Sequence, residues 1–523
     1  MEDRKAVLSR TMIVRDIFRH WPIWTISFIF YFFTVWLSNS VAKSFMSGER
    51  DLNSAVTVMD SLISVTTVAA FVMGLAASWA AFGFMENRRK HYFFESLPYS
   101  RRHLFINRFV FGFALCMIPC IAIFFMELFQ MFALCGSFEM IMLLKWLLSA
   151  LCEYFFWYSF GVLFFTVSGR AMMAVFCYIF FAVVGYLLSL YMELCNMACY
   201  IGFNMGTGSG NSVLGIFSPL HYVFGIQISD YWDYEKVGGV NGQLFLDGSA
   251  LKLCVLFFAG VILTVAAFFL FKRRKSEKTG DTLVFKGMKY IFSWMITFFA
   301  TLSVAFLLYG TIFYTNDAIA HRPVERVKII VILSIVGFLL FLGSCMIVEK
   351  KFKVLKANWL KALIFTAVLA FLGTAYLHDA FNIEGYIPKQ DEVKYIHSNK
   401  EDMLFEIYFS EGTSRIKTMS ESSAIEVMTG LHKLILDNMD ELEEMYTHTG
   451  AYDLSKGREI NYYYLSISYK LKNDTNITRY YMIVEGSELD GKVRDYLGIK
   501  ELKSNEPEDN DNDDSYRIDP EGR

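Results

Sequence analysis

The stretch "GLAASWAAFGFMENRRKHYFFESLPYSRRHL", Gly74 to Leu104, leads from the end of one long apolar run to the start of another. Two such runs indicate two membrane spans, because about 20 apolar residues are needed to cross roughly 30 Å of hydrocarbon. Small residues four apart, in the pairs Ala76/Ala80 and Ala77/Ala81, let helices approach closely, so we expect the first span to pack inside a bundle. The loop holds five Arg and Lys residues and a Tyr-Phe-Phe cluster. Cytoplasmic loops are typically basic, but the aromatic cluster needs a further explanation.

The composition of the whole chain is that of a membrane protein. Of 523 residues, 54% are hydrophobic and only 19% are charged, whereas about 25% of residues are charged in soluble domains. We predict a polytopic α-helical membrane protein with about nine transmembrane helices and a small C-terminal α+β soluble domain. The expected spans are residues 21–38, 57–84, 104–135, 141–168, 171–192, 251–271, 290–312, 328–348 and 360–377.

The distribution of basic residues predicts the orientation of the spans. Loops on the side of the N-terminus hold 23 Lys and Arg residues, and loops on the opposite side hold 6. The positive-inside rule therefore predicts a cytoplasmic N-terminus and, with nine spans, an extracytoplasmic C-terminal domain. If one of the last three spans is interfacial instead, that domain is cytoplasmic. The formal net charge of −3 argues against nucleic acid as a partner.

Six segments differ in pattern and define the expected domains. Apolar residues at helical spacing among basic ones predict an amphipathic helix on the membrane surface at the N-terminus. The segments are 1–20, the amphipathic helix; 21–271, a six-span core; 272–289, a cytoplasmic basic linker; 290–377, three additional spans; 378–500, the α+β domain; and 501–523, an acidic disordered tail.

The C-terminal domain shows both strand and helix patterns. Alternating apolar residues predict strands over 403–409, 461–471 and 478–484. Between the first two, Ser423 and Glu426 form a capping-box pattern at the start of an expected helix. These patterns predict a small sheet packed with at least one helix.

Three polar residues are embedded deeply in apolar runs: Glu127, Gln130 and Glu153. Carboxylates are costly to bury in a membrane, so these residues are candidates for lining a transport pathway. In the structural alternative, Glu127 lies near the outer end of its span and is wetted, and Glu153 pairs with a Tyr or Ser of a neighbouring span.

The sequence lacks the common enzyme motifs of membrane proteins. It contains neither His-Glu-x-x-His nor a phosphate loop ending in Gly-Lys-Ser/Thr, so we expect no catalytic residues. A polytopic membrane enzyme would need an outer-loop base, for which Asp51 is the nearest candidate. We expect no metal site, because Cys195 and Cys199 are most simply small buried apolar residues.

The loop after Gly74–Gly83 resembles the intracellular loop of ABC-2 type transporter permeases, in which a short coupling helix leads through a Leu-Pro-x-Ser-Arg turn into the third span. Here Leu97-Pro98-Tyr99-Ser100-Arg101 occupies that place, and Pro98 suits a helix start between Ser96 and Arg101. Ser218, Pro219, Leu220 and Tyr222 before the sixth span also fit the pattern. The extra spans and the C-terminal domain are similar to those of a subgroup of Firmicute permeases.

The resemblance implies that the loop docks on a separate ABC ATPase subunit and that ATP binds to that subunit, so this chain would need no cofactor. The expected coupling residues are Glu86, Arg88, Arg89, Tyr92, Phe93, Phe94, Glu95, Leu97, Pro98 and Arg101. Phe93 and Phe94 are both expected to be exposed.

The resemblance further implies a multi-pass permease in a bacterial cell membrane. It would work as a homodimer or as a heterodimer with a paralogous permease, surrounded by membrane lipid. The expected cargo of an exporter of this kind is amphiphilic: a peptide antibiotic, a lipid or an envelope component. The alternative function is an envelope sensor or regulator whose extracytoplasmic C-terminal domain binds a ligand.

Overall fold

The computed structural model describes most of the two predicted regions, the helical part and the α+β part. The described residues are 10–45, 52–96, 99–135, 140–203, 218–220, 222–223, 249–275, 277, 279–312, 323–349, 354–397, 418–419, 422–448, 462–472 and 476–497. The chain forms two compact units. One comprises Met1–Tyr191, Ser212–Tyr309 and Ile330–Phe371, and the other Met192–Asn211, Gly310–Ile329 and Leu372–Arg523.

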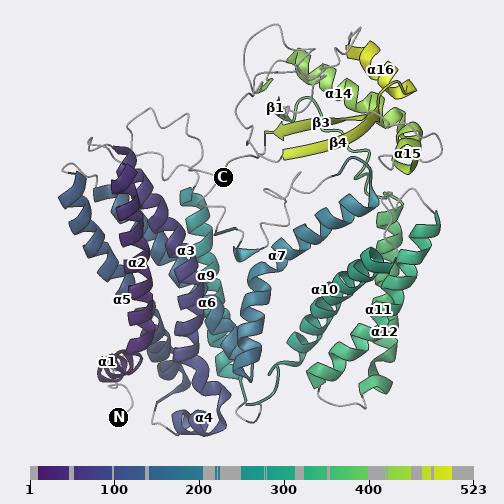
Figure 1. Cartoon of the computed structure of the whole chain (residues 1–523). Coiled ribbons are helices and arrows are strands. Elements are labelled where there is room, and N and C mark those ends of the chain that lie inside the picture. Colours follow the sequence, from purple (N-terminus) through teal and green to yellow (C-terminus); the bar gives the residue numbers. More distant parts are fainter. Residues whose placement is uncertain are drawn as a thin grey trace, which may run out of the picture. The chain divides into compact units, whose positions relative to one another are not determined.

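Helices make up most of the first unit (Figure 1). They are α1 (Arg10–Arg19), α2 (Trp21–Phe45), α3 (Leu52–Phe82), the 3-10 turn η1 (Gly83–Glu86), α4 (Arg88–Glu95), α5 (Arg101–Cys135), α6 (Met140–Val167), α7 (Ala171–Cys199), α9 (Ser249–Arg273), α10 (Lys286–Ile312), α11 (Pro323–Glu349) and α12 (Val354–Leu377). The last residues of α7, α10 and α12 and the first residues of α11 belong to the second unit.

Eight of the described helices are long and apolar enough to cross a membrane: α3, α5, α6, α7, α9, α10, α11 and α12. The apolar part of α2 in the described residues, Trp21–Phe33, is shorter than these. Many large apolar side chains on these helices are exposed, among them Ile262, Leu339 and Phe371. Because soluble proteins rarely expose such wide apolar surfaces, the prediction of a polytopic helical membrane protein is confirmed.

Helices α3 and α6 form the centre of the six-helix core. Ala77 and Ala81 of α3 are fully buried, which confirms that α3 is an inner packing helix. Gly74 of α3 lies against Trp157 of α6 so closely that a Cβ on Gly74 would be 2.7 Å from the Trp157 Cβ. On the same interface, a Cβ on Gly161 of α6 would clash with the Ser78 side chain. Small residues therefore allow the two backbones to touch.

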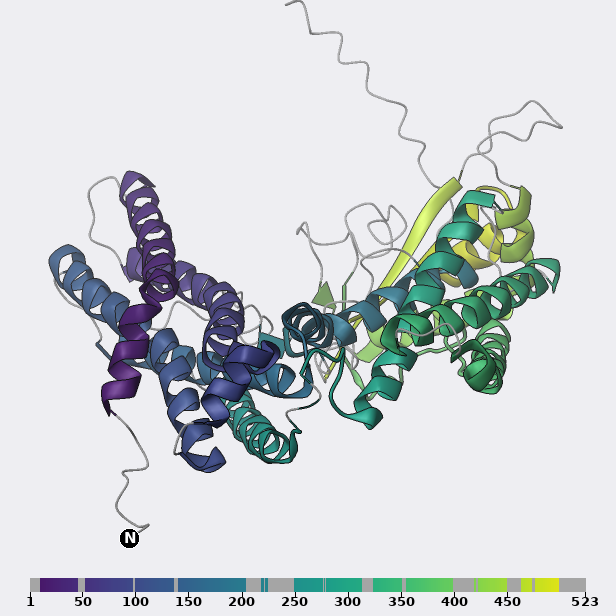
Figure 2. The same cartoon turned by 90° about the horizontal axis from the view of Figure 1, so that it is seen from below.

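Helix α1 lies across the axis of α2, as the views from the side and from below show (Figures 1 and 2). It confirms a helix within the predicted segment 1–20, of which residues 1–9 lie outside the described part. Val14 and Phe18, one turn apart, are exposed, whereas Asp16 is buried. An exposed apolar stripe on a helix next to a span is typical of helices that lie in the membrane interface.

Helices α10, α11 and α12 share a small core of their own. Phe341 and Phe365 are buried in it, with their ring centroids 5.2 Å apart. Hydroxyl groups link α10 to α11: the Ser344 Oγ lies 2.9 Å from the Ser293 Oγ and 2.7 Å from the Thr297 Oγ1. Such hydroxyl contacts bind helices together in an apolar solvent.

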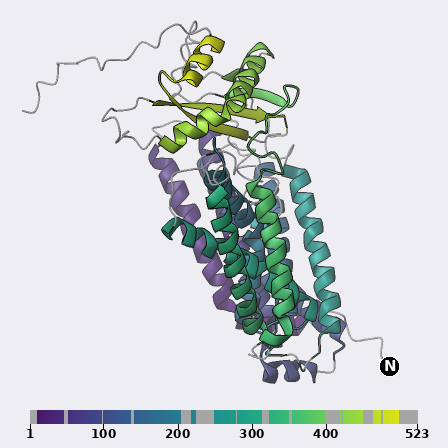
Figure 3. The same cartoon turned by 90° about the vertical axis from the view of Figure 1, so that its right-hand side faces the viewer.

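The α+β region of the second unit contains a four-stranded antiparallel sheet with the strand order β2-β1-β3-β4 (Figures 1 and 3). Its elements are β1 (Val393–His397), β2 (Thr418–Met419), α14 (Ser422–Asp437), α15 (Met439–His448), β3 (Tyr462–Leu471), β4 (Asn476–Val484) and α16 (Glu488–Leu497). Buried residues of α14, α15 and α16 form one core with those of the strands.

The structure confirms the two C-terminal strands predicted over 461–471 and 478–484. The strand predicted over 403–409 and the tail 501–523 lie outside the described residues. Strand β1 was not predicted, and Ser423 lies inside α14, which begins at Ser422, so the expected capping box is wrong in position.

A buried histidine joins helix α14 to the sheet. His432 is fully buried; its Nε2 lies 2.8 Å from the Tyr481 hydroxyl oxygen and its Nδ1 lies 3.2 Å from that of Tyr469. Burial lowers the pKa of His432 to about 3, and the positive charge of Arg479 acts in the same direction. His432 is therefore neutral at physiological pH and acts as a packing residue with two hydrogen-bonding partners.

Buried polar contacts also tie the ends of α7 and α12 to this sheet. Arg479 of β4 lies over the ring of Phe203, with its Cζ 4.0 Å from the centroid, and donates a hydrogen bond to the Ile383 carbonyl oxygen. The Glu384 carboxylate accepts a hydrogen bond of 2.8 Å from the Ile201 N–H, which follows α7. The helix ends and the sheet are thus parts of one unit.

We expect Gly74→Ala to lower the free energy of unfolding of the helical core by about 1–3 kcal/mol, because the new methyl group meets the Trp157 backbone, which cannot rotate away. The measurement is thermal unfolding of the detergent-purified chain. The matched control is Gly343→Ala in α11, where a Cβ meets nothing within 4 Å. Equal melting temperatures for the two variants would contradict the close α3–α6 packing.

We expect the α+β region to lose stability in acid because of His432. An unfolded histidine binds a proton below about pH 6.5, whereas the folded site binds one only near a pKa of about 3. The free energy of unfolding should therefore fall as the pH drops through that window. In thermal unfolding from about pH 7 to about pH 4, His432→Gln should flatten the pH dependence relative to the unaltered chain. Identical slopes for the two proteins would refute this account.

Candidate functional site

The loop between α3 and α5 folds into η1 and the short helix α4. The Asn87 side chain caps α4: its Oδ1 accepts hydrogen bonds from the N–H groups of Arg89 at 3.0 Å and Lys90 at 3.5 Å. Asparagine is a preferred N-cap residue, because its side-chain oxygen pairs with N–H groups that have no partner inside the helix. Ser96 ends α4, and its hydroxyl donates to the Phe93 carbonyl oxygen at 2.8 Å. The sequence thus encodes both ends of the helix.

Helix α4 has an outer face with aromatic and basic side chains. Tyr92 is 57% exposed and Phe93 is 61% exposed, and Arg89, one turn earlier, is also exposed. Large exposed aromatic side chains next to an arginine are characteristic of residues that anchor protein interfaces.

The opposite face of α4 packs against the helical core. The ring centroids of Phe94 and Phe84, which belongs to η1, are 4.6 Å apart, and His91 stacks on Phe84 with its centroid 6.3 Å away. The expectation that Phe93 and Phe94 are both exposed is therefore wrong for Phe94. Helical geometry explains the difference, because consecutive residues are about 100° apart around a helix of 3.6 residues per turn.

Beneath Phe94 lies a buried ion pair between two helices. Arg108 of α5 and Asp16 of α1 are both buried, with Nη1 and Oδ2 3.1 Å apart. The Arg108 Cζ also lies 4.3 Å from the centroid of Phe94, in a cation–π arrangement. One guanidinium group thus connects α4, α5 and α1.

A second buried arginine, Arg274, joins the ends of other helices. It is 3% exposed, and its Nη1 donates to the carbonyl oxygens of Phe165, Thr166 and Ser168 at 3.0, 2.9 and 2.8 Å. Its Nη2 donates to the Met85 carbonyl oxygen at 2.9 Å. The last carbonyl groups of a helix have no partner inside it, so Arg274 stabilises the end of α6 and holds η1 beside it.

Arg274 remains charged in this buried position. Burial lowers its pKa to about 10, and the nearby Glu86 carboxylate acts in the opposite direction. At neutral pH the side chain is therefore a guanidinium cation.

Two further arginines, Arg88 of α4 and Arg101 at the start of α5, contact the end of α9 and the basic linker that follows it. The Arg101 Nη1 donates to the carbonyl oxygens of Lys272 at 3.2 Å and Arg274 at 2.9 Å. The Arg88 Nε donates to the Thr279 carbonyl oxygen at 3.3 Å. The predicted coupling residues Arg88 and Arg101 thus have structural contacts within the chain.

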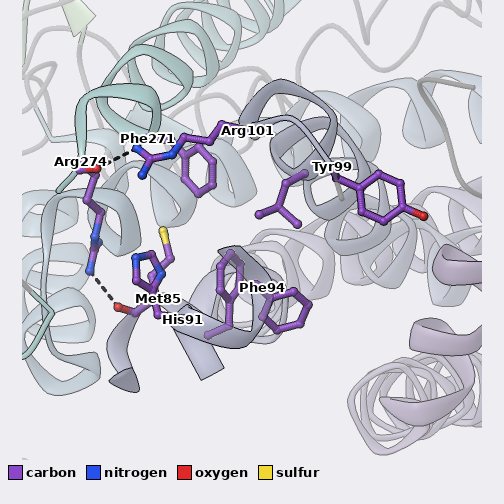
Figure 4. Close-up of a pocket in the computed structure, with 9 residues that line it drawn as sticks. Met85, His91, Phe94, Tyr99, Arg101, Phe271 and Arg274 are labelled. Atoms are coloured by element: carbon purple, nitrogen blue, oxygen red, sulfur yellow. Dashed lines mark hydrogen bonds between the residues drawn. The ribbon is translucent and has the colours of Figure 1, made fainter. Parts of the chain in front are cut away.

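A cavity of about 260 Å³ opens among these elements (Figure 4). It is lined by residues of η1, α4, the start of α5, the end of α9 and the linker: Phe84, Met85, His91, Phe94, Tyr99, Arg101, Leu104, Phe271 and Arg274. Its wall combines aromatic rings with two arginines.

Of the remaining predicted coupling residues, the structure describes some and leaves others outside the described part. Glu86 ends η1 beside Arg274. Glu95 is the last residue of α4, but its side chain, like Leu97 and Pro98, lies outside the described residues. The predicted helix start between Ser96 and Arg101 is found at Arg101, where α5 begins, whereas Ser96 caps the preceding helix.

The predicted pathway residues lie inside the helical core. Glu153 of α6 is 1% exposed; its Oε2 accepts a hydrogen bond of 3.0 Å from Thr67 of α3, and its Oε1 one of 3.4 Å from Ser149. Glu127 of α5 is fully buried within the protein. The Gln130 side chain lies outside the described part. The contacts of Glu153 with hydroxyl groups fit a structural role better than a place on an open pathway.

Ser218 and Tyr222, which contributed to the resemblance, join neighbouring helices. The Ser218 hydroxyl donates to the Ala182 carbonyl oxygen of α7 at 2.8 Å, and the Tyr222 hydroxyl donates to the Lys252 carbonyl oxygen of α9 at 3.3 Å.

Comparison with known proteins identifies no relative. No protein-family model matches the sequence, and neither a curated protein nor a solved structure matches it.

Sequence reasoning missed Asp16, Arg108 and Arg274 as residues of this junction. A signal for Arg108 exists, since it is a lone arginine in an apolar run, "HLFINRFVFGF". Such a residue is expected to face the interior of the bundle and to pair. Arg274 has no such signal, because it is one of four consecutive basic residues, Lys272 to Lys275.

We expect Arg274→Gln to destabilise the helical core, because at least two of the four buried carbonyl groups lose their donor, at a cost of about 1–3 kcal/mol for each unsatisfied group. The melting temperature of the detergent-purified chain should fall by several degrees. Arg273→Gln removes the same charge from the neighbouring exposed position and should have little effect. A similar melting temperature for both variants would show that the carbonyl contacts of Arg274 contribute nothing.

Proposed function

We propose that this chain is the membrane-spanning permease subunit of an ABC transporter and that the outer face of α4 docks on a separate ATPase subunit. The observation that carries the proposal is the two-sided construction of α4. Tyr92 and Phe93 are exposed on one face, while Phe94 and His91 on the other are packed into the core. A helix with one face packed on the core and exposed aromatic side chains on the other can bind a partner and transmit its movement to the core.

The internal contacts of α4 supply a route for that movement. From Phe94 the contacts run to Arg108 of α5 and on to Asp16 of α1. Through Arg88, α4 also contacts the linker that leads from α9 toward α10. A displacement of α4 by the ATPase would therefore reach α5, α1 and the linker between α9 and α10. ATP itself would bind to and be hydrolysed by the partner subunit.

The resemblance to ABC-2 type permeases supplies the rest of the proposal. The α4 side of the membrane is cytoplasmic, in agreement with the excess of basic residues in the loops on that side. Two permease subunits, identical or paralogous, pair over two ATPase subunits in a bacterial cell membrane. The cargo is an amphiphilic compound that is exported.

We expect the double substitution Tyr92→Ala and Phe93→Ala to abolish co-purification of the ATPase without unfolding the chain, because both side chains are exposed in the isolated subunit. The measurement is affinity purification of the detergent-solubilised chain from its native host, followed by mass spectrometry of bound proteins. Phe129→Ala, at an exposed position near the other end of α5, is the matched control and should retain the ATPase.

The possible outcomes separate the functions. A nearly stoichiometric protein with ATP-binding motifs, retained by the control and lost with the double variant, supports the permease. Retention by the double variant would disprove the docking role of α4. A chain recovered alone or with a histidine kinase would favour the envelope sensor or regulator instead.

A further inference from the structure

The cavity beside α4 lies at the ends of the membrane-spanning helices. Three apolar spans begin or end at its wall: Val65–Glu86, Arg101–Phe129 and Leu251–Arg273. The ends of apolar spans mark the boundary between the hydrocarbon core and the layer of lipid head groups. The cavity therefore lies where a phospholipid carries its phosphate group.

The polar part of the wall is cationic. Arg274 is more than nine-tenths buried, and its Nε–H has no hydrogen-bond acceptor within the described part of the chain, although both Nη atoms are paired. Arg101 adds a second guanidinium group at the first residue of α5. The N-terminus of a long helix also carries a partial positive charge. The buried Arg274 contributes positive charge to the wall, and the exposed guanidinium of Arg101 can donate hydrogen bonds to a phosphate oxygen.

One acidic side chain opposes this charge. Glu86 lies close enough to Arg274 to affect its pKa. The adjacent basic residues Lys272, Arg273 and Lys275 outnumber it, so the surroundings remain positive. Electrostatics at this site therefore favours an anion.

The other part of the wall is apolar. Phe84, Phe94, Leu104 and Phe271 line it. The volume of about 260 Å³ is slightly below the roughly 300–1,000 Å³ of sites for drug-sized molecules. A site with a cationic end, an apolar wall and this size fits a phosphorylated head group better than a whole amphiphile.

We propose that this cavity binds the phosphate group of an anionic phospholipid, held between Arg101 and Arg274 against α4. Basic pockets between helices on the cytoplasmic side of membrane proteins recognise anionic head groups in this way. A lipid bound there contacts η1, α4, α5 and α9 together. The site does not depend on the proposed ATPase partner, so it can be tested without one.

The experiment is a titration of the delipidated, detergent-purified full chain with short-chain phosphatidylglycerol, short-chain phosphatidylcholine or inorganic phosphate, with the melting temperature as the readout. Phosphatidylglycerol should raise the melting temperature in a saturable manner, and phosphatidylcholine should not. Arg101→Gln should weaken the apparent affinity about tenfold, since it removes a charged donor. Arg101→Lys should retain most of the affinity, and Arg102→Gln, at the exposed neighbouring arginine that does not line the cavity, should bind as the unaltered chain does.

The melting temperature of each variant without ligand shows whether it folds, so a failed variant is not mistaken for lost binding. If inorganic phosphate stabilises as well as phosphatidylglycerol and with the same dependence on Arg101, the site binds phosphate as a free anion, and the lipid source is overturned. Equal stabilisation by phosphatidylcholine and phosphatidylglycerol, or equal behaviour of Arg101→Gln and Arg102→Gln, would overturn the anion site itself.

Discussion

The junction at the base of the helical unit depends on the need of helix ends for hydrogen-bonding partners. The last carbonyl groups of every α-helix lack a donor, and near a membrane water can satisfy them only partly. Arg274 supplies donors for three carbonyl groups at the end of α6 and for one in η1. The guanidinium group suits this position because its donors are held in a fixed plane and it keeps its charge. Without it, the Met85 carbonyl group of η1 would lose its donor, and the bridge from η1 to the end of α6 would be lost.

Much of the helical architecture could be predicted from the sequence, since apolar runs of sufficient length have one stable form in a bilayer. The small-residue pairs also identified α3 as an inner helix, because small side chains let a neighbouring helix approach closely. Ala77 and Ala81 are indeed fully buried. The inward face of α4 was harder to predict. Tyr92, Phe93 and Phe94 are chemically alike, and only the turn of the helix decides that Phe94 contacts Arg108.

The C-terminal domain shows a different limit of sequence reasoning. The patterns of β3 and β4 are long and alternate regularly, so both strands were predicted. Strand β1 has five residues, "VKYIH", and is stabilised by pairing with β3, more than seventy residues later in the chain. Local patterns carry little information on such a distant partner. The same holds for His432, whose two tyrosine partners come from different strands.

The glycine contacts between α3 and α6 have a mechanical consequence. Where Gly74 meets the Trp157 backbone and Gly161 meets Ser78, no flexible side chain separates the helices. Close-packed contacts of this kind resist continuous deformation. They change, if at all, by switching from one packing arrangement to another. The two helices therefore form one rigid pair. In the chain, η1 and α4 follow directly after α3. If α4 were displaced as the proposed function requires, α3 and α6 would be expected to move together, and the bending would fall elsewhere among the spans.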